Sequence, residues 1–277
     1  NPALRREWRS LNPEEQEQYL TAVKCLTQNP SRLGLPTTRY DDFVYVHIKL
    51  YDGAHNVAPS LPWHRYFIYV FEKTLRSECG YNNYLPYWDW TLDSAQPEHS
   101  PIWSPQIGFG GNGDASSHCV QDGYFLDISP QYPSQHCLRR NFTAGMNGFN
   151  YTADIISELI QNANTYEEFR SRLESGPHKS VHNGIGGEMP TDASPNDPIF
   201  YVHHAQIDRL WWNWQRKRPD ERFREYFGPL TIENGSKPEA FSASLQDTIQ
   251  MLGLAEDRTA SDVMTIESGL FCYTYIR

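Results

Sequence analysis

The sequence predicts a mainly helical fold that carries long irregular loops and a few short strands. Three observations support this prediction. Apolar residues recur with helical spacing in five separate segments of the chain. The middle of the chain is rich in Gly, Pro, Ser and Asn and shows no sustained period, and its C-terminal part mixes turns with short strand-like runs.

The first helix is expected over residues 13–27. Asn12 is a suitable N-cap, Pro13 suits the first helical position, and two glutamates follow in the first turn. Two further helices are expected over residues 41–51 and 63–75, where the apolar side chains repeat with helical spacing.

Residues 84–150 are predicted to form long loops, because they include the Gly-rich stretch 110–113 and lack any period. Helical patterning returns over residues 153–174 and again over 198–216. A strand is expected within residues 270–276. Because no stretch resembles a linker, we expect one domain across the whole chain.

Charge and hydropathy exclude several classes of protein. The chain has 24 Lys and Arg against 34 Asp and Glu, a net charge of −10, and its basic residues do not cluster. Nucleic-acid binding and anionic-membrane binding both need a basic surface, so neither is expected. No apolar run approaches the ~18 residues that a membrane-spanning helix needs.

Glycosylation sequons and cysteines point to an oxidising environment. Three acceptor sequons begin at Asn141, Asn150 and Asn234. Together with the acidic charge and several cysteines, they predict a secreted, extracellular glycoprotein.

The five cysteines include no CxxC pair, so a zinc ribbon is not indicated. Sequence alone does not determine connectivity; we expect the disulfides Cys25–Cys79 and Cys119–Cys137. Cys272 is then either a free thiol or the partner of a cysteine upstream of this sequence.

Histidines form two groups along the chain. One group lies in or beside the early helical segments, and the other lies around the last two. The members are His47, His55 and His64 in the first group, and His178, His182, His203 and His204 in the second. Two histidines four residues apart share a helix face and can chelate one ion. Facing helices of a four-helix bundle can present such side chains to a metal pair, so we expect a dinuclear metal site there.

An isolated HxxxH pair is usually incidental, but the presence of two groups of histidines in one chain favours metal binding. Neutral imidazoles without carboxylate or thiolate suit copper, zinc or iron, and argue against calcium, magnesium and iron–sulfur clusters. Asp208 lies one helical turn after His204, where it is expected to anchor the imidazole side or the neighbouring backbone.

These motifs resemble those of the type-3 copper polyphenol oxidases, the tyrosinases and catechol oxidases, especially the short fungal ones. The matching segments are VH (46–47), HN (55–56), LPWHRYF (61–67), LPYWDW (85–90), GPH (176–178), NDPIFYVHHAQIDRLW (196–211) and the closing YTY (273–275). The resemblance covers nearly the whole chain.

The resemblance implies a single catalytic domain over residues 1–277 with no C-terminal lid, two copper ions (Cu A and Cu B), and O₂ as co-substrate. It assigns His47, His55 and His64 to one copper, and His178, His182 and His204 to the other. It also implies that His203 supports the site and that Phe200 packs over the second copper.

In this family a glutamate shortly before the first ligand of the second copper, and an asparagine just after that ligand, position a water that helps to deprotonate the phenol. Glu174 matches that glutamate, although a solvated carboxylate at a helix end is an equal alternative. Lys179 stands where the asparagine is usual. Its cation could orient acidic substrates, suppress deprotonation of monophenols, or point into solvent. Gly53 replaces a cysteine that many relatives link to a histidine.

The resemblance predicts a polyphenol oxidase that oxidises catechols to o-quinones and reduces O₂ to water. With Lys179 in place of the usual asparagine, we expect weak or absent monophenol hydroxylation, and with the sequons and cysteines we expect a secreted protein; we also expect a monomer. Two alternatives remain open. One is a hemocyanin-like O₂ carrier, from which turnover of any catechol would distinguish the enzyme. The other is a non-redox zinc enzyme on the same histidines, because imidazole binds copper and zinc alike.

Overall fold

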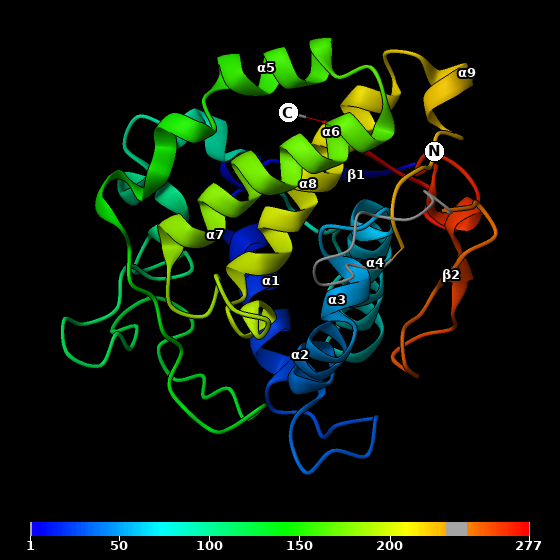
Figure 1. Cartoon of the computed structure of the whole chain (residues 1–277). Helices are drawn as coiled ribbons and strands as arrows, with labels where there is room; N and C mark the ends of the chain where they lie inside the picture. Colours follow the sequence, from blue (N-terminus) through cyan, green and yellow to red (C-terminus); the bar gives the residue numbers. More distant parts are fainter. Residues whose placement is uncertain (1, 231–242, 277) are drawn as a thin grey trace.

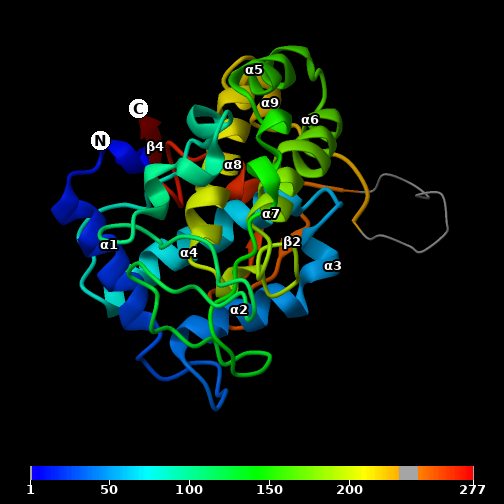
Figure 2. The same ribbon diagram turned by 90° about the vertical axis from the view of Figure 1, so that its left-hand side faces the viewer.

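A bundle of four helices lies at the centre of the molecule (Figure 1). The computed structural model describes residues 2–230 and 243–276. The four helices are α2 (Arg39–Lys49), α4 (Ser60–Glu78), α7 (Lys179–Ile185) and α8 (Ile199–Gln215). Helix α4 packs against α8, and Figure 2 shows both of them beside α7. The predicted helical bundle with long loops and a few short strands is confirmed.

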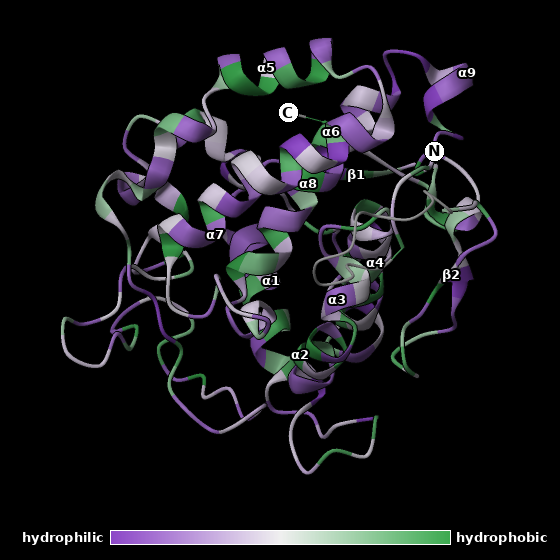
Figure 3. Cartoon of the chain, in the orientation of Figure 1, coloured by the Kyte–Doolittle hydropathy of each residue, from purple (hydrophilic) through white to green (hydrophobic). Residues whose placement is uncertain are grey.

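Helix α8 is the central element of the bundle. Every residue of it except Asn213 is buried, which is typical of a helix surrounded by the protein on all sides. By contrast, the outer helix α5 (Ala153–Asn162) is amphipathic: Ile156 and Leu159 are buried, and Figure 3 shows its apolar side turned toward the molecule. The two adjacent histidines, His203 and His204, are therefore carried by the most buried helix.

Side-chain caps fix the starts of the first helices. Helix α1 (Pro13–Leu26) begins as predicted: the Asn12 side chain accepts a bond from the Glu15 N–H (3.0 Å), and the Glu15 carboxylate accepts one from the Asn12 N–H (2.9 Å). Helix α2 begins before the predicted residue 41, because Thr38 and Asp41 form the same reciprocal cap. The remaining short helices are α3 (Tyr51–Ala54) and α9 (Pro219–Arg222).

The helical segment predicted over residues 153–174 is interrupted, which corrects the prediction. It forms α5 and α6 (Tyr166–Leu173), followed by a π-helical turn, η6 (Glu174–His178). The Ala163 carbonyl accepts bonds from Trp214 Nε1 (2.8 Å) and Arg222 Nη2 (2.9 Å), and Thr165 caps the new helix. Tertiary hydrogen bonds to the Ala163 carbonyl therefore accompany the end of α5, and the Thr165 cap begins α6.

Residues 84–150 are irregular, as predicted. They contain only short 3₁₀ turns and isolated bridges. Arg140 attaches this region to the start of α8: its buried guanidinium donates to Asp197 (2.6 and 2.8 Å) and to the carbonyls of Phe109 (2.9 Å) and Gly110 (2.7 Å). The 3₁₀ turns in the described part of the chain are η1 (Trp8–Ser10), η2 (Trp90–Asp93), η3 (Pro97–His99), η4 (Pro101–Trp103), η5 (Ala144–Asn150), η7 (Ser194–Asn196) and η8 (Ala260–Val263).

Two small sheets complete the fold. Strand β1 (Ala3–Arg6) pairs in parallel with β4 (Tyr273–Ile276), so the strand predicted within residues 270–276 is confirmed. Strands β2 (Thr248–Ile249) and β3 (Arg258–Thr259) form an antiparallel pair. Across the described residues, no helix combines the length and apolar character needed to cross a membrane.

Both predicted disulfides are present. Cys25–Cys79 joins the ends of α1 and α4, and Cys119–Cys137 closes part of the long loop. Cys272 is a free, exposed thiol.

Candidate metal centre

Three histidines from three consecutive elements form the first cluster. His47 lies in the last turn of α2, His55 directly follows α3, and His64 lies in the first part of α4. One ring nitrogen from each lies within 4.8 Å of the others, and all three residues are buried. This cluster brings together the three histidines predicted for one metal ion.

Backbone carbonyls orient each imidazole of this cluster. Nδ1 of His47 donates to the Asp192 carbonyl (2.6 Å), that of His55 to Tyr51 (2.9 Å), and that of His64 to Ser60 (2.8 Å). A carbonyl only accepts hydrogen bonds, so Nδ1 carries the proton and Nε2 keeps its lone pair. Such bonds from the far ring nitrogen are the usual support of a metal-binding histidine.

The second cluster contains four histidines. The ring nitrogens of His178, His182, His203 and His204 lie within 4.8 Å of one another. Nδ1 of His178 donates to the Glu174 carbonyl (3.3 Å), and Nδ1 of His182 donates to the Met189 carbonyl. The cluster thus contains one more imidazole than the three predicted for the second ion.

The two clusters face each other across α4 and α8. The rings of His64 and His204 are stacked, with centroids 4.2 Å apart and planes 7° from parallel. Phe200 is fully buried, and its ring centroid lies 5.2 Å from that of His47 and 4.2 Å from that of His204. Phe200 therefore packs against the second cluster, as expected, and also contacts the first.

The histidines have the protonation state and the free atoms that metal binding requires. Burial lowers the pKa of His55 and of His182 to about 4, so both imidazoles are neutral at pH 7. Burial also lowers the pKa of the other five. Among the described residues no group hydrogen-bonds Nε2 of His47, His64, His182 or His204, although all four atoms are buried. Buried polar atoms rarely lack a partner, so these nitrogens fit a pair of copper ions, which imidazole suits.

A cavity of about 190 Å³ opens onto both clusters. Its lining includes His55, His178 and His182. It also contains Glu174 and Lys179, the two residues predicted to act on the substrate. The remaining lining residues are Tyr51, Asn56, Ser175, Asn183, Met189, Pro190, Thr191 and Ser194.

Glu174 is buried in this cavity rather than solvated, which overturns the alternative of an exposed helix-end carboxylate. One of its oxygens accepts the Asn56 N–H (2.6 Å), and the other accepts from Arg170 Nη1 (2.7 Å). Burial raises the pKa of Glu174, while the Asn56 hydrogen bond and the Arg170 charge oppose that shift. Lys179, the first residue of α7, is exposed at the cavity surface.

Asp208 does not support His204, contrary to the prediction. Its buried carboxylate accepts hydrogen bonds from Arg65 and from the hydroxyls of Tyr273 and Tyr275 (2.6 Å each). Neither ring nitrogen of His204 has a hydrogen-bond partner within the described ranges. A buried guanidinium requires a counter-charge, so the carboxylate pairs with Arg65 and ties α8 to α4.

Arg170, Asn56 and Asp192 complete the site but were not identified from the sequence. The i,i+4 spacing of Arg170 and Glu174 on one helix was a usable signal for their pairing. Asn56 and Asp192 contribute backbone atoms, which every residue type has, so the sequence does not reveal these two contacts.

The predicted sugar-bearing asparagines are not part of the site. Asn141 is exposed and Asn150 is partly buried; Asn234 lies outside the described residues. Glycosylation at all three stays a prediction.

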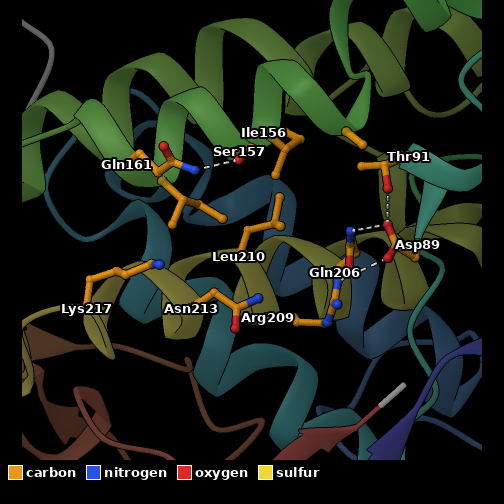
Figure 4. A pocket seen from close by; sticks show the side chains of 12 residues that line it. Asp89, Thr91, Ile156, Ser157, Gln161, Gln206, Arg209, Leu210, Asn213 and Lys217 are labelled. Carbon is orange, nitrogen blue, oxygen red and sulfur yellow. Dashed lines mark hydrogen bonds and ion pairs between the residues drawn. The ribbon is translucent and has the colours of Figure 1, made fainter.

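A second cavity, of about 320 Å³, lies between α5 and α8 (Figure 4). Ile156 faces it from α5 and Leu210 from α8, and at one end Asp89 bonds Gln206 (2.9 Å) and Arg209 (3.2 Å). No histidine is found among the described residues that line this cavity, so the metal clusters belong to the smaller one.

The chain is similar to known proteins along nearly its whole length. The family model described as the common central domain of tyrosinase matches residues 37–217. A tyrosinase-like protein, phomQ1', from Diaporthe leptostromiformis is 39% identical over 99% of this chain and 80% of its own length. Tyrosinase ustQ from Aspergillus flavus is also 39% identical, over 99% of this chain and 80% of its own length. The structure of a polyphenol oxidase variant from Thermothelomyces thermophila superposes with a TM-score of 0.88 at 30% identity, covering 100% of this chain and 89% of the other.

Proposed function

The chain belongs to the tyrosinase family of type-3 copper enzymes, and on this premise we propose that it oxidises o-diphenols to o-quinones, with weak or absent hydroxylation of monophenols. It is a polyphenol oxidase-like oxidoreductase with a dinuclear copper site and O₂ as co-substrate. In the proposed reaction, two catechols and one O₂ give two o-quinones and two waters. The observation that carries the proposal is a pair of facing histidine clusters that share one small cavity with a single carboxylate.

Six histidines are proposed to hold the copper pair. His47, His55 and His64 would bind one ion, and His178, His182 and His204 the other. His204 is favoured over His203 because its ring stacks on His64, so it faces the neighbouring cluster. His203 would then fill the space behind the second ion. When bound, the copper ions supply the electron transfer between catechol and O₂.

Glu174 is proposed to position the water that accepts the phenolic proton. Two donors fix its carboxylate, and it lines the same cavity as His55 and His178. A carboxylate so held remains an acceptor toward the cavity, because each oxygen has two lone pairs. A phenol entering between these histidines would therefore meet a fixed proton acceptor.

Glu174→Gln is expected to lower catechol turnover about a hundredfold, the lower end of what general acid–base catalysis contributes. The amide can still accept the Asn56 N–H but cannot take up a proton from water. The matched control is Glu167→Gln, since Glu167 bonds the same guanidinium of Arg170 (2.6 and 3.0 Å) but does not line the cavity. Steady-state kinetics should show little change in the control. Equal losses in both variants would assign the effect to Arg170 and not to proton acceptance.

Lys179, the residue that follows His178, is the basis for the proposed weak activity on monophenols. An ammonium group has three donors and no acceptor, so Lys179 can donate to a water but cannot accept a hydrogen bond from it, as an amide oxygen can, and a water that accepts from a cation is a poorer proton acceptor. Among the described residues that line the cavity, Glu174 is then the one carboxylate available for this task.

Oxygen consumption with 4-methylcatechol and with tyramine tests the proposed function. We expect lag-free oxidation of the catechol and a rate for tyramine lower by about 10², as expected when assistance to proton removal is missing. Lys179→Asn should raise the tyramine rate. Fast, lag-free turnover of tyramine by the unsubstituted protein would contradict the preference for o-diphenols.

We further propose that the enzyme acts outside the cell as a monomer. Its two disulfides support this setting, because disulfides persist in oxidising compartments, and so do the sequons at Asn141 and Asn150.

A further inference from the structure

The charge of the catalytic cavity is unusual for this chain. The protein carries a net charge of −10, yet the described residues that line the cavity include only two charged side chains, Glu174 and Lys179. The buried Glu174 is already paired with Arg170 at 2.7 Å. Arg170 is shared with Glu167 (2.6 Å), so both carboxylates are paired with this one guanidinium, and Lys179 is the charged group of the cavity that takes no part in the cluster.

Lys179 has no counter-ion of its own. Within residues 2–230 and 243–276, no carboxylate lies within ion-pair distance of its ammonium group, which also makes no hydrogen bond there. A cation without an internal partner is available to a ligand. Its position is set by the backbone, because it directly follows His178 and begins α7.

A neutral hydrogen-bonding group accompanies this cation. Asn183 lies four residues after Lys179, so the two occupy one face of α7, and both are exposed and line the cavity. An ammonium and an amide N–H₂ both donate hydrogen bonds. Such a pair matches the two oxygens of a carboxylate.

The volume of the cavity limits how a substrate is seated. At about 190 Å³ it is smaller than the ~300–1,000 Å³ of sites that enclose drug-sized ligands. A single aromatic ring with a short side chain fits such a space. With the ring between His55 and His178, the side chain is the part of the substrate that can reach Lys179 and Asn183.

We propose that Lys179, assisted by Asn183, selects catechols whose side chain ends in a carboxylate. This inference rests on the proposed oxidation of o-diphenols and names its substrate class. The proposed contact is with the side chain of the substrate and not with its reacting oxygens, so it would bind ground state and transition state alike and act mainly through KM. Lys179 is thus a specificity-determining residue for the side chain of the substrate.

The test compares two catechols of equal size, 3-(3,4-dihydroxyphenyl)propionic acid and its amide, with the copper-loaded enzyme. We expect the acid to have a kcat/KM roughly fivefold above that of the amide, the upper end for an ion pair with an exposed partner. The difference should reside in KM and should shrink as salt is added.

Three variants separate this contact from other effects. Lys179→Met should abolish the preference for the acid, whereas Lys179→Arg should keep most of it. Lys73→Met is the charge-matched control, because Lys73 is exposed on α4 and does not line the cavity; it should leave the acid-to-amide ratio unchanged. Asn183→Leu should reduce the ratio by a smaller factor.

The outcomes also separate the inference from the function on which it depends. If neither catechol is oxidised, the proposed function fails. If both are oxidised with equal KM, or if Lys73→Met changes the ratio as much as Lys179→Met does, the assignment of Lys179 is overturned while the catechol oxidase activity stands.

Discussion

His204→Ala is expected to remove one of the two copper ions and to lower catechol oxidation at least about a hundredfold, since loss of groups that merely support a metal ligand already costs about 10–100-fold. The remaining cluster of His47, His55 and His64 should still hold its ion, because its three orienting carbonyls do not depend on α8. Copper content per chain and the rate of oxygen consumption measure the two effects.

His203→Ala is the matched control for this variant. Both histidines are buried on α8, and neither ring has a hydrogen-bond partner among the described residues, so removal leaves a similar void. We expect the His203 variant to retain two copper ions. If instead it loses one ion while His204→Ala keeps both, the assignment of the third ligand is reversed. His99→Ala, at an exposed position outside both clusters, should change neither quantity.

Asp208→Asn is expected to produce the largest loss of stability, lowering the free energy of unfolding by about 3–5 kcal/mol, the range for breaking a buried ion pair from one side. The Asp208 carboxylate pairs with Arg65 and lies 3.7 Å from Arg5, and both guanidinium groups are fully buried. Tyr273 and Tyr275 each donate a hydroxyl to the same oxygen atom (2.6 Å). Neutralising Asp208 leaves Arg65 without its counter-charge in the core.

Urea denaturation of Asp208→Asn and of a control variant measures the change in the free energy of unfolding. The control is Glu158→Gln, which removes one partner of an exposed pair with Arg172 (3.2 Å) and should cost at most about 1 kcal/mol. If Asp208→Asn is as stable as the control, the Asp208 cluster does not hold α4, α8 and the closing strand together as described.

Local geometry predicts one pair of the histidines, whereas the full set of six ligands was predicted from the family resemblance. His178 and His182 share a helix face through their spacing alone, and the structure keeps them on one face across the junction of η6 and α7. The pairing of Cys25 with Cys79 was likewise predicted, and it joins the ends of two helices whose positions the pattern already indicated.

Features that depend on distant parts of the chain could not be predicted. The carbonyls of Asp192 and Met189, which orient His47 and His182, are backbone atoms of an irregular loop. Asp208 was placed correctly on the helix but given the wrong partner, because the competing guanidinium of Arg65 comes from 143 residues earlier. The break before α6 has the same origin, since it depends on tertiary bonds to the Ala163 carbonyl.

The central claim is that the two facing histidine clusters hold two copper ions that oxidise catechols. The most direct measurement is the metal content per chain of protein purified without added metal, determined by mass spectrometry. We expect two coppers and negligible zinc. One or two zinc ions with negligible copper, in protein that fails to oxidise catechol after copper reconstitution, would contradict the account.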